Sequence, residues 1–328
     1  MSPTRRSTHR KKVTLALGGG GARGLAHLGA IHEILSAGFE IERVVGVSIG
    51  ALVGAMYAFQ PDLNAIQERA LQFLRSPEFQ RHQQRLFGTR LGDSPDTPGT
   101  IATRYRRLAD ALRANRLMYR AIRRSSLVSG ELLELVVKEL LPDADLRDAA
   151  IPVCLIAVDL HSGRPVVFEQ GPVRLAARAS ASVPGIFPPV AHEQQLLADI
   201  GGFAALPLGV ARQLPHELLF AIDVGTELKP IARHPSAVEI LLRMNDIGAA
   251  LFREHVHESA DLVIAPAVRH VEWCDFTSAE VLIQAGRQAA RDALTQYALP
   301  RSRHDSGSRL ARPGARNGAG QRSGMRDD

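Results

Sequence analysis

The sequence predicts an α/β fold in which a mostly parallel central sheet is covered by helices on both faces. Short β-branched and apolar runs alternate along the chain with longer segments of helical periodicity. Neighbouring parallel strands need crossover connections, which are usually helices, so this alternation favours a parallel sheet. Of the 328 residues, 45% are hydrophobic and 23% are charged, which is typical of a folded protein with a sizeable core.

The first elements are expected as strand, helix, strand and helix. The run VTLAL (13–17) is β-branched and apolar and ends in four glycines. In GLAHLGAIHEILSAGF (24–39), apolar side chains recur at helical spacing. IERVVGVS (41–48) is typical of a short strand, and IGALVGAMYAF (49–59) of a helix that ends before Pro61.

The remaining elements follow the same alternation. Residues 62–140 are predicted as helices and loops, interrupted by the breaker-rich GDSPDTPGT (92–100). The later strands are expected at 152–160, 166–170, 219–225 and 261–266, and the later helices at 237–256 and 278–297. No internal repeat or linker interrupts residues 13–299, so we expect a single domain there, between an N-terminal arm (1–12) and a C-terminal tail (300–328).

The net charge of +6 is concentrated at the two ends. Residues 1–12 carry five Lys or Arg and no acid, and residues 301–328 carry seven Arg against three Asp, which leaves about −3 for the body. Both ends are rich in Arg, Gly or Ser and lack the apolar content needed to fold. Solvated tails are the simplest interpretation, and contact with an anionic membrane surface is the alternative, at about 1 kcal/mol per cation.

A second basic segment, residues 101–124, holds eight arginines and one acid, Asp110, along a predicted amphipathic helix. Such a helix suits a lipid interface, but we favour a domain helix whose apolar face packs on the core and whose arginines are solvated. Zinc-finger and aromatic RNA-binding patterns are absent from the sequence, so no nucleic-acid partner is expected.

No run of about 18 apolar residues and no secretory signal pattern occur in the sequence, so we expect a cytoplasmic protein, with peripheral membrane contact as an option. Two cysteines, Cys154 and Cys274, do not make a disulfide framework.

The glycine-rich stretch GGGGARG (18–24) follows a strand and opens a helix. It contains GxGxxG at Gly19, Gly21 and Gly24, and Glu40 lies about 20 residues on, as in a dinucleotide-binding fingerprint. However, Glu40 precedes the second strand, whereas the ribose-binding acid should follow it. A tight turn explains one or two glycines but not four. Converging backbone N–H groups at a helix start favour an anion site instead, such as an oxyanion hole.

The second strand runs directly into GVSIG (46–50), which places Ser48 between two glycines at a strand–turn–helix elbow. Small residues allow the strained turn of a nucleophile elbow and let substrate approach. An α/β-hydrolase would supply a histidine base, and His255, His257 and His270 follow in the chain. Because only one strand precedes that of Ser48 and these histidines have no neighbouring signature, we favour a base elsewhere.

Five motifs resemble those of patatin-like phospholipases in order and spacing, most closely the bacterial members, over about residues 13–290. They are GGGGARG, GVSIGALVGAMYA, AVDLHSGRPVVF, RASASVPGIFPPV and LLADIGGFAALPL. The resemblance implies a three-layer α/β/α domain with a Ser–Asp dyad, no catalytic histidine, no metal and no cofactor.

On matching positions, the resemblance implies that Ser48 is the nucleophile, that Asp199 is the base and that Gly19, Gly20 and Gly21 form the oxyanion hole. Arg23 matches the arginine of the family motif and is expected to steady the loop or to meet an anionic head group, with an ordinary surface ion pair as the alternative. Other motif positions support this geometry: Gly24, Gly46, Gly50 and Gly201.

One position departs from the family pattern, which reads Asp-Gly-Gly or Asp-Gly-Ala. Here the motif is Asp199-Ile200-Gly201, and Pro207 keeps its usual offset, so residue 200 is a substitution and not an insertion. Glycine permits a positive φ, which a β-branched residue tolerates poorly. We therefore expect the strand before Asp199 to run on slightly and displace the carboxylate. Ala205 also stands where the family often has asparagine.

The resulting hypothesis is a serine acyl hydrolase of phospholipase A or lysophospholipase type, acting on lipid acyl esters. Asp199 would take the Ser48 proton, and since a free carboxylate has a pKa near 3.9, it must be desolvated to act as a base at neutral pH. The alternative is a catalytically weakened lipid-binding or regulatory protein, for which Ile200 is the main support. The motifs specify neither the lipid nor the oligomeric state.

Overall fold

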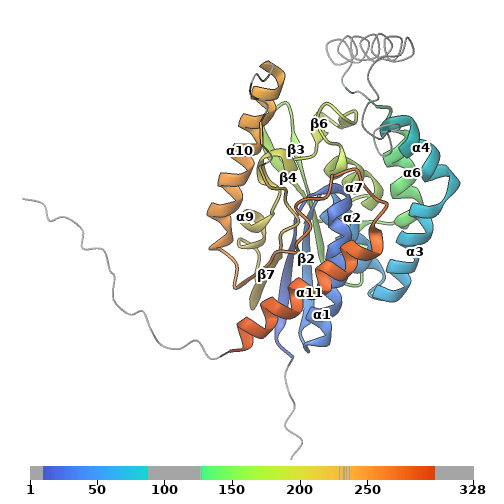
Figure 1. Cartoon of the computed structure of the whole chain (residues 1–328). Helices are drawn as coiled ribbons and strands as arrows, with labels where there is room; N and C mark the ends of the chain where they lie inside the picture. Colours follow the sequence, from blue (N-terminus) through green and yellow to red (C-terminus); the bar gives the residue numbers. More distant parts are fainter. Residues whose placement is uncertain are drawn as a thin grey trace, which may run out of the picture.

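A computed structural model describes residues 10–87, 126, 128–228, 230, 231, 233, 235 and 237–299 (Figure 1). Its centre is a sheet with the strand order β5-β6-β3-β2-β1-β7-β8, and β4 also pairs with β3. The strands are β1 (Lys12–Leu17), β2 (Glu40–Val47), β3 (Val153–Asp159), β4 (Arg164–Phe168), β5 (Val190–His192), β6 (Gln195–Ala198), β7 (Leu218–Ile222) and β8 (Leu262–Ile264).

The strands from β3 through β8 in this order are parallel, whereas β4, β5 and β6 pair antiparallel at the other side. The sheet is therefore mostly parallel, as predicted. Parallel strands share one carboxyl edge, which is where the loops that follow β1, β2 and β7 meet.

Helices connect and cover these strands. They are α1 (Ala26–Ser36), α2 (Ile49–Phe59), α3 (Leu63–Arg75), α4 (Pro77–Phe87), α6 (Glu131–Leu140), α7 (Val173–Ala181), α8 (Gly201–Ala204), α9 (Leu208–Ala211), α10 (Ala237–His257) and α11 (Ala279–Ala298). Two short 3₁₀ helices, η1 (Gly21–Leu25) and η2 (Leu146–Asp148), complete the described elements.

Side chains that alternate along β1 enter different apolar cores. Leu15 and Leu17 pack with α1, α2 and α11 in the larger core, and Ala16 packs in a second core with Leu208 of α9 and Val256 of α10. Because successive side chains of a strand point to opposite faces, helices must cover both faces of the sheet. Figure 1 shows α9 and α10 on one side of the sheet and α1 and α11 on the other. The three-layer α/β/α class is thus confirmed.

Element positions agree closely with the sequence pattern. β1 begins at Lys12, one residue before the expected domain start, and the helices predicted at 237–256 and 278–297 are α10 and α11. The arm and tail beyond residues 10 and 299, and the basic segment 101–124, lie outside the described residues. Within the described part of the chain, no helix combines the length and the hydropathy that a membrane crossing requires.

Candidate active site

Ser48 occupies the one-residue turn between the end of β2 at Val47 and the start of α2 at Ile49. Its backbone has φ 56° and ψ −123°, a positive φ that non-glycine residues rarely adopt. A Cβ at Gly46 or Gly50 would overlap neighbouring backbone, so the elbow closes only with glycine on both sides. Local strain of this kind is characteristic of functional sites.

Asp199 directly follows β6, and its side chain is 5% exposed. Its Oδ1 accepts the backbone N–H of Gly201 at 2.6 Å. Burial raises the pKa of Asp199 from its usual 3.8 to about 6, while hydrogen bonds from the Ser48 side chain and from Gly201 act in the opposite direction. The structure therefore brings Ser48 and Asp199 into direct contact, as the two motifs predicted.

The substitution at residue 200 does not extend the strand. β6 ends at Ala198, before Asp199, so the expected run-on of the strand is wrong. Ile200 has φ −82° and ψ −8°, which is ordinary helical backbone that any residue adopts. Its side chain is 8% exposed and belongs to the second apolar core. A β-branched residue fits here because this turn needs no positive φ.

The glycine loop lies against the nucleophile, since a Cβ on Gly19 would lie 3.2 Å from the Cβ of Ser48. The Gly19 N–H donates to the carbonyl of Ala205 at 2.8 Å, and the Ala22 N–H donates to the carbonyl of Trp273 at 2.7 Å. Within the described part of the chain, the N–H groups between these two, those of Gly20 and Gly21, have no hydrogen-bond acceptor. Two of the three glycines predicted for the oxyanion hole thus carry unoccupied donors.

Close packing explains the glycines of this loop. A Cβ on Gly20 would lie 2.6 Å from the carbonyl oxygen of Val224, and Gly21 has φ +60° and faces Trp273 at similarly close range. Neither position has room for a side chain. The loop is therefore held between the end of β7 and the segment before α11.

Arg23, in the same loop, bonds to two backbone carbonyls from other parts of the chain. Its side chain is 7% exposed, and its Nε donates to the Val224 carbonyl at 3.0 Å while its Nη1 donates to the Val271 carbonyl at 2.9 Å. Two carbonyl bonds from one buried guanidinium fit the loop-steadying role expected for this residue better than direct contact with a head group.

His27 is a contributor that the sequence did not reveal. It is fully buried, and its Nε2 lies 2.8 Å from the carbonyl oxygen of Gly18 at the start of the loop. Burial lowers the pKa of His27 to about 4, so the ring is neutral at physiological pH and donates from Nε2. A histidine on an apolar helical face carries no sequence signal for this contact.

The histidines that follow Ser48 in the chain do not join it. His257 contacts the buried carboxylate of Asp223, with 3.1 Å between its Nε2 and Oδ2, and Arg253 and Arg269 lie 3.5 Å from the same oxygen. This cluster anchors α10 at the end of β7. His255 and His270 are both exposed.

The buried thiol of Cys154 lies on β3 and contacts a carboxylate. Burial raises the pKa of the Cys154 thiol to about 12, and its Sγ lies 3.3 Å from Glu169. Among the described residues, no three His, Cys, Asp or Glu side chains are grouped as a metal site would require.

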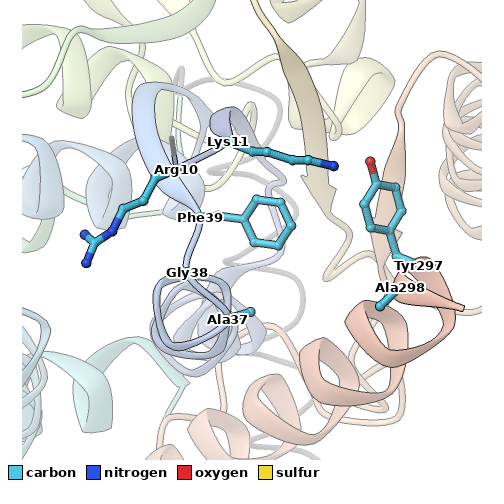
Figure 2. A pocket seen from close by; sticks show the side chains of 7 residues that line it. All are labelled: Arg10, Lys11, Ala37, Gly38, Phe39, Tyr297 and Ala298. Atoms are coloured by element: carbon cyan, nitrogen blue, oxygen red, sulfur yellow. The ribbon is translucent and has the colours of Figure 1, made fainter. Parts of the chain in front are cut away.

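A cavity of about 550 Å³ lies at the amino ends of the parallel strands, where β1 begins and α11 ends. Figure 2 shows Lys11, Phe39 and Tyr297 around it, while Arg10 points away. Since Ser48 follows the carboxyl end of β2, this cavity is separated from Ser48 by the length of the sheet and takes no part in its chemistry.

Comparison with known proteins places these features in a family context. The Patatin-like phospholipase family model matches residues 15–212. An NTE family protein of Mycobacterium tuberculosis is 29% identical over 250 residues, which cover 75% of this chain and 59% of the relative. A patatin-like phospholipase domain-containing protein of Caenorhabditis elegans is 28% identical over 243 residues, or 72% of this chain and 16% of that protein. The chain thus spans less than two thirds of the first relative and about a sixth of the second.

Two solved structures also match. VipD from Legionella pneumophila has 13% sequence identity and a TM-score of 0.39, with 88% of this chain and 67% of that chain covered. ExoU from the type III secretion system of Pseudomonas aeruginosa has 16% identity and a TM-score of 0.33, with 88% and 52% covered.

Proposed function

Because the chain belongs to the patatin-like phospholipase family, we propose that it is a serine acyl hydrolase that cleaves lipid acyl esters with a Ser48–Asp199 dyad. The observation that carries the proposal is the pairing of a serine on a strained elbow with a buried carboxylate whose pKa is raised to about 6. Such a carboxylate is ionised at neutral pH and is a better base than a solvated one.

In the first step, Ser48 Oγ attacks the acyl carbonyl carbon and its proton passes to the carboxylate of Asp199. The carbonyl oxygen becomes an oxyanion, which the free N–H groups of Gly20 and Gly21 would stabilise. When the ester bond breaks, the departing alcohol takes the proton from Asp199 and leaves an acyl-enzyme on Ser48.

In the second step, a water molecule gives its proton to Asp199 and attacks the same carbonyl carbon. The bond to Ser48 Oγ then breaks, Ser48 recovers the proton, and a fatty acid leaves. The acyl ester that these two steps cleave is present in glycerophospholipids, lysophospholipids and neutral glycerides. We propose the phospholipase A or lysophospholipase type from the family relationship.

The alternative function is that of a catalytically weakened lipid-binding protein, which the absence of hydrolysis in the experiments below would favour. Its main support was the isoleucine at residue 200, and the ordinary backbone there removes the reason to expect a displaced carboxylate. Membrane contact through the basic arms or through residues 101–124 stays a prediction.

The test is hydrolysis of p-nitrophenyl butyrate and of fluorescent phosphatidylcholine vesicles by the full chain, beside the variants Ser48→Ala and Asp199→Asn. Ser36→Ala is the matched control, since the Ser36 hydroxyl is exposed and bonds only within α1. We expect kcat to fall by about 10³-fold or more in both site variants and to stay unchanged in the control.

A fluorophosphonate probe should label wild type on the peptide that carries Ser48, and should not label Ser48→Ala. Hydrolysis that persists in Ser48→Ala, or labelling at another serine, would refute the dyad. A wild type that neither hydrolyses esters nor reacts with the probe would favour the lipid-binding alternative.

A further inference from the structure

The end of α7 contacts both residues of the proposed dyad. The Ser180 Oγ accepts the backbone N–H of Ser48 at 2.9 Å. Two residues later, the Ser182 carbonyl accepts the backbone N–H of Asp199 at 2.9 Å. One short stretch of chain therefore holds the nucleophile and the base, although these two lie 151 positions apart in the sequence.

Ser180 is fully buried, and both of its hydrogen bonds are made. Its hydroxyl proton goes to the carbonyl of Ile156 in β3 at 2.6 Å, which leaves its lone pairs for the Ser48 N–H. A hydroxyl has a single proton to donate, so the first bond fixes the direction of the second. The bridge runs from β3 through Ser180 to the elbow.

The bridge begins where the parallel ladder stops. β2 and β3 remain in register up to Val47 opposite Ile156, and the chain then turns away at Ser48. Ser180 supplies the acceptor that the sheet no longer offers to the Ser48 N–H. Ser48 holds a positive φ, and its carbonyl accepts the N–H groups of Ala51 and Leu52 in α2. The bond to Ser180 restrains the other side of the strained turn, and with it the direction of Oγ.

We propose that Ser180 is a positioning residue for the hydrolysis, acting through the Ser48 backbone to keep Oγ aligned with Asp199. The inference rests on the proposed function and deepens it. Replacing Ser180 by alanine leaves two buried groups, the Ser48 N–H and the Ile156 carbonyl, without a partner. The elbow can then relax, and misplacement by about 1 Å costs on the order of 10²-fold in rate.

Ser36 offers a control outside the site. It ends α1, and its Oγ donates to the His32 carbonyl at 2.8 Å, one turn back. Ser36→Ala therefore removes a serine hydroxyl that bonds within its own helix, and it leaves the bridge intact.

The experiment compares Ser180→Ala, Ser180→Cys and Ser36→Ala with wild type in kcat, KM and the pH dependence of kcat/KM. We expect kcat to fall by about 10–100-fold in Ser180→Ala, with KM within twofold of wild type. The loss should be smaller in Ser180→Cys, which keeps a weak acceptor, and Ser36→Ala should change kcat by no more than twofold. The acidic limb should also move to higher pH in Ser180→Ala, because the Ser48 hydrogen bond that lowers the pKa of Asp199 is weakened.

The rate of hydrogen exchange at the Ser48 backbone amide tests the hydrogen bond to Ser180 directly, and it can be measured even if the protein does not hydrolyse esters. Exchange should be faster in Ser180→Ala and unchanged in Ser36→Ala. Equal kcat losses in the two alanine variants, or an unchanged Ser48 amide in a folded Ser180→Ala, would overturn the inference. If wild type proves inactive, the proposed function fails, while the amide measurement still decides whether Ser180 holds the elbow.

Discussion

Replacing Asp199 by asparagine should make the protein more stable at alkaline pH while it abolishes hydrolysis. The Asp199 side chain is 5% exposed and accepts hydrogen bonds from Ser48 and Gly201. Among the ion pairs of the described residues, none involves this carboxylate. Its ionisation is therefore opposed by burial without compensation from a cation, and asparagine removes the charge at nearly the same volume.

The size of the effect follows from the pKa of Asp199, which is raised from 3.8 to about 6. A difference of about 2 pKa units corresponds to about 3 kcal/mol. Because the folded-state pKa is raised, the native protein binds this proton more readily than the unfolded chain. The cost of the charge is therefore fully present above pH 6 and disappears as pH falls toward 4.

Urea denaturation of wild type and Asp199→Asn at pH 8, 6 and 4.5 measures this cost. We expect the free energy of unfolding of the variant to exceed that of wild type by up to about 3 kcal/mol at pH 8. This difference should decrease steadily as the pH is lowered. His27, whose pKa is lowered to about 4, destabilises both proteins alike below about pH 6.5 and cancels from the difference. Asp143→Asn, at a side chain that is 88% exposed, is the control.

A stability difference that does not change with pH would refute the reasoning, since it would reflect packing and not charge. A wild type that is more stable than the variant at pH 8 would refute it as well. The same pKa also requires kcat/KM of wild type to fall below about pH 6, where Asp199 becomes protonated and can no longer accept a proton.

Two further substitutions test the loop and the departure from the family motif. Gly20→Ala should abolish hydrolysis because its Cβ would lie 2.6 Å from the Val224 carbonyl oxygen. The control is Gly209→Ala, which should leave hydrolysis intact because no atom lies within 4 Å of its Cβ. The rate of p-nitrophenyl butyrate hydrolysis measures both effects. Ile200→Gly should lower the free energy of unfolding by about 2–5 kcal/mol without raising activity, and increased activity would restore the displaced-carboxylate interpretation.

Much of the fold was predictable because it depends on hydrophobic periodicity, which a single sequence displays. The runs at 13–17 and 41–48 and the helix at 49–59 were placed within a residue or two of β1, β2 and α2. A strand before Asp199 was expected from the family motif, but its hairpin with β5 was not predicted, since three- and four-residue strands are too short to show a period. It matters because β6 leads directly into Asp199.

Only the parts of the site that lie in a recognisable sequence motif could be predicted. The contact between Ser48 and Asp199 agrees with the motifs, but the use of the Gly19 N–H by Ala205 does not follow from them. Neither does the support from Ser180 and His27, since both act through hydrogen bonds to distant backbone groups. Such contacts are set by tertiary structure and leave no periodic or local trace in the sequence.

The glycine loop lies near the start of the chain but is held by residues near its end. The Ala22 N–H bonds to Trp273, and Arg23 reaches Val224 and Val271. During synthesis, the loop emerges about 250 residues before its last supports. The loop is therefore not held in this geometry until residues 224–273 have been synthesised, so that a hydrolase built in this way would stay silent toward lipid up to that point of translation.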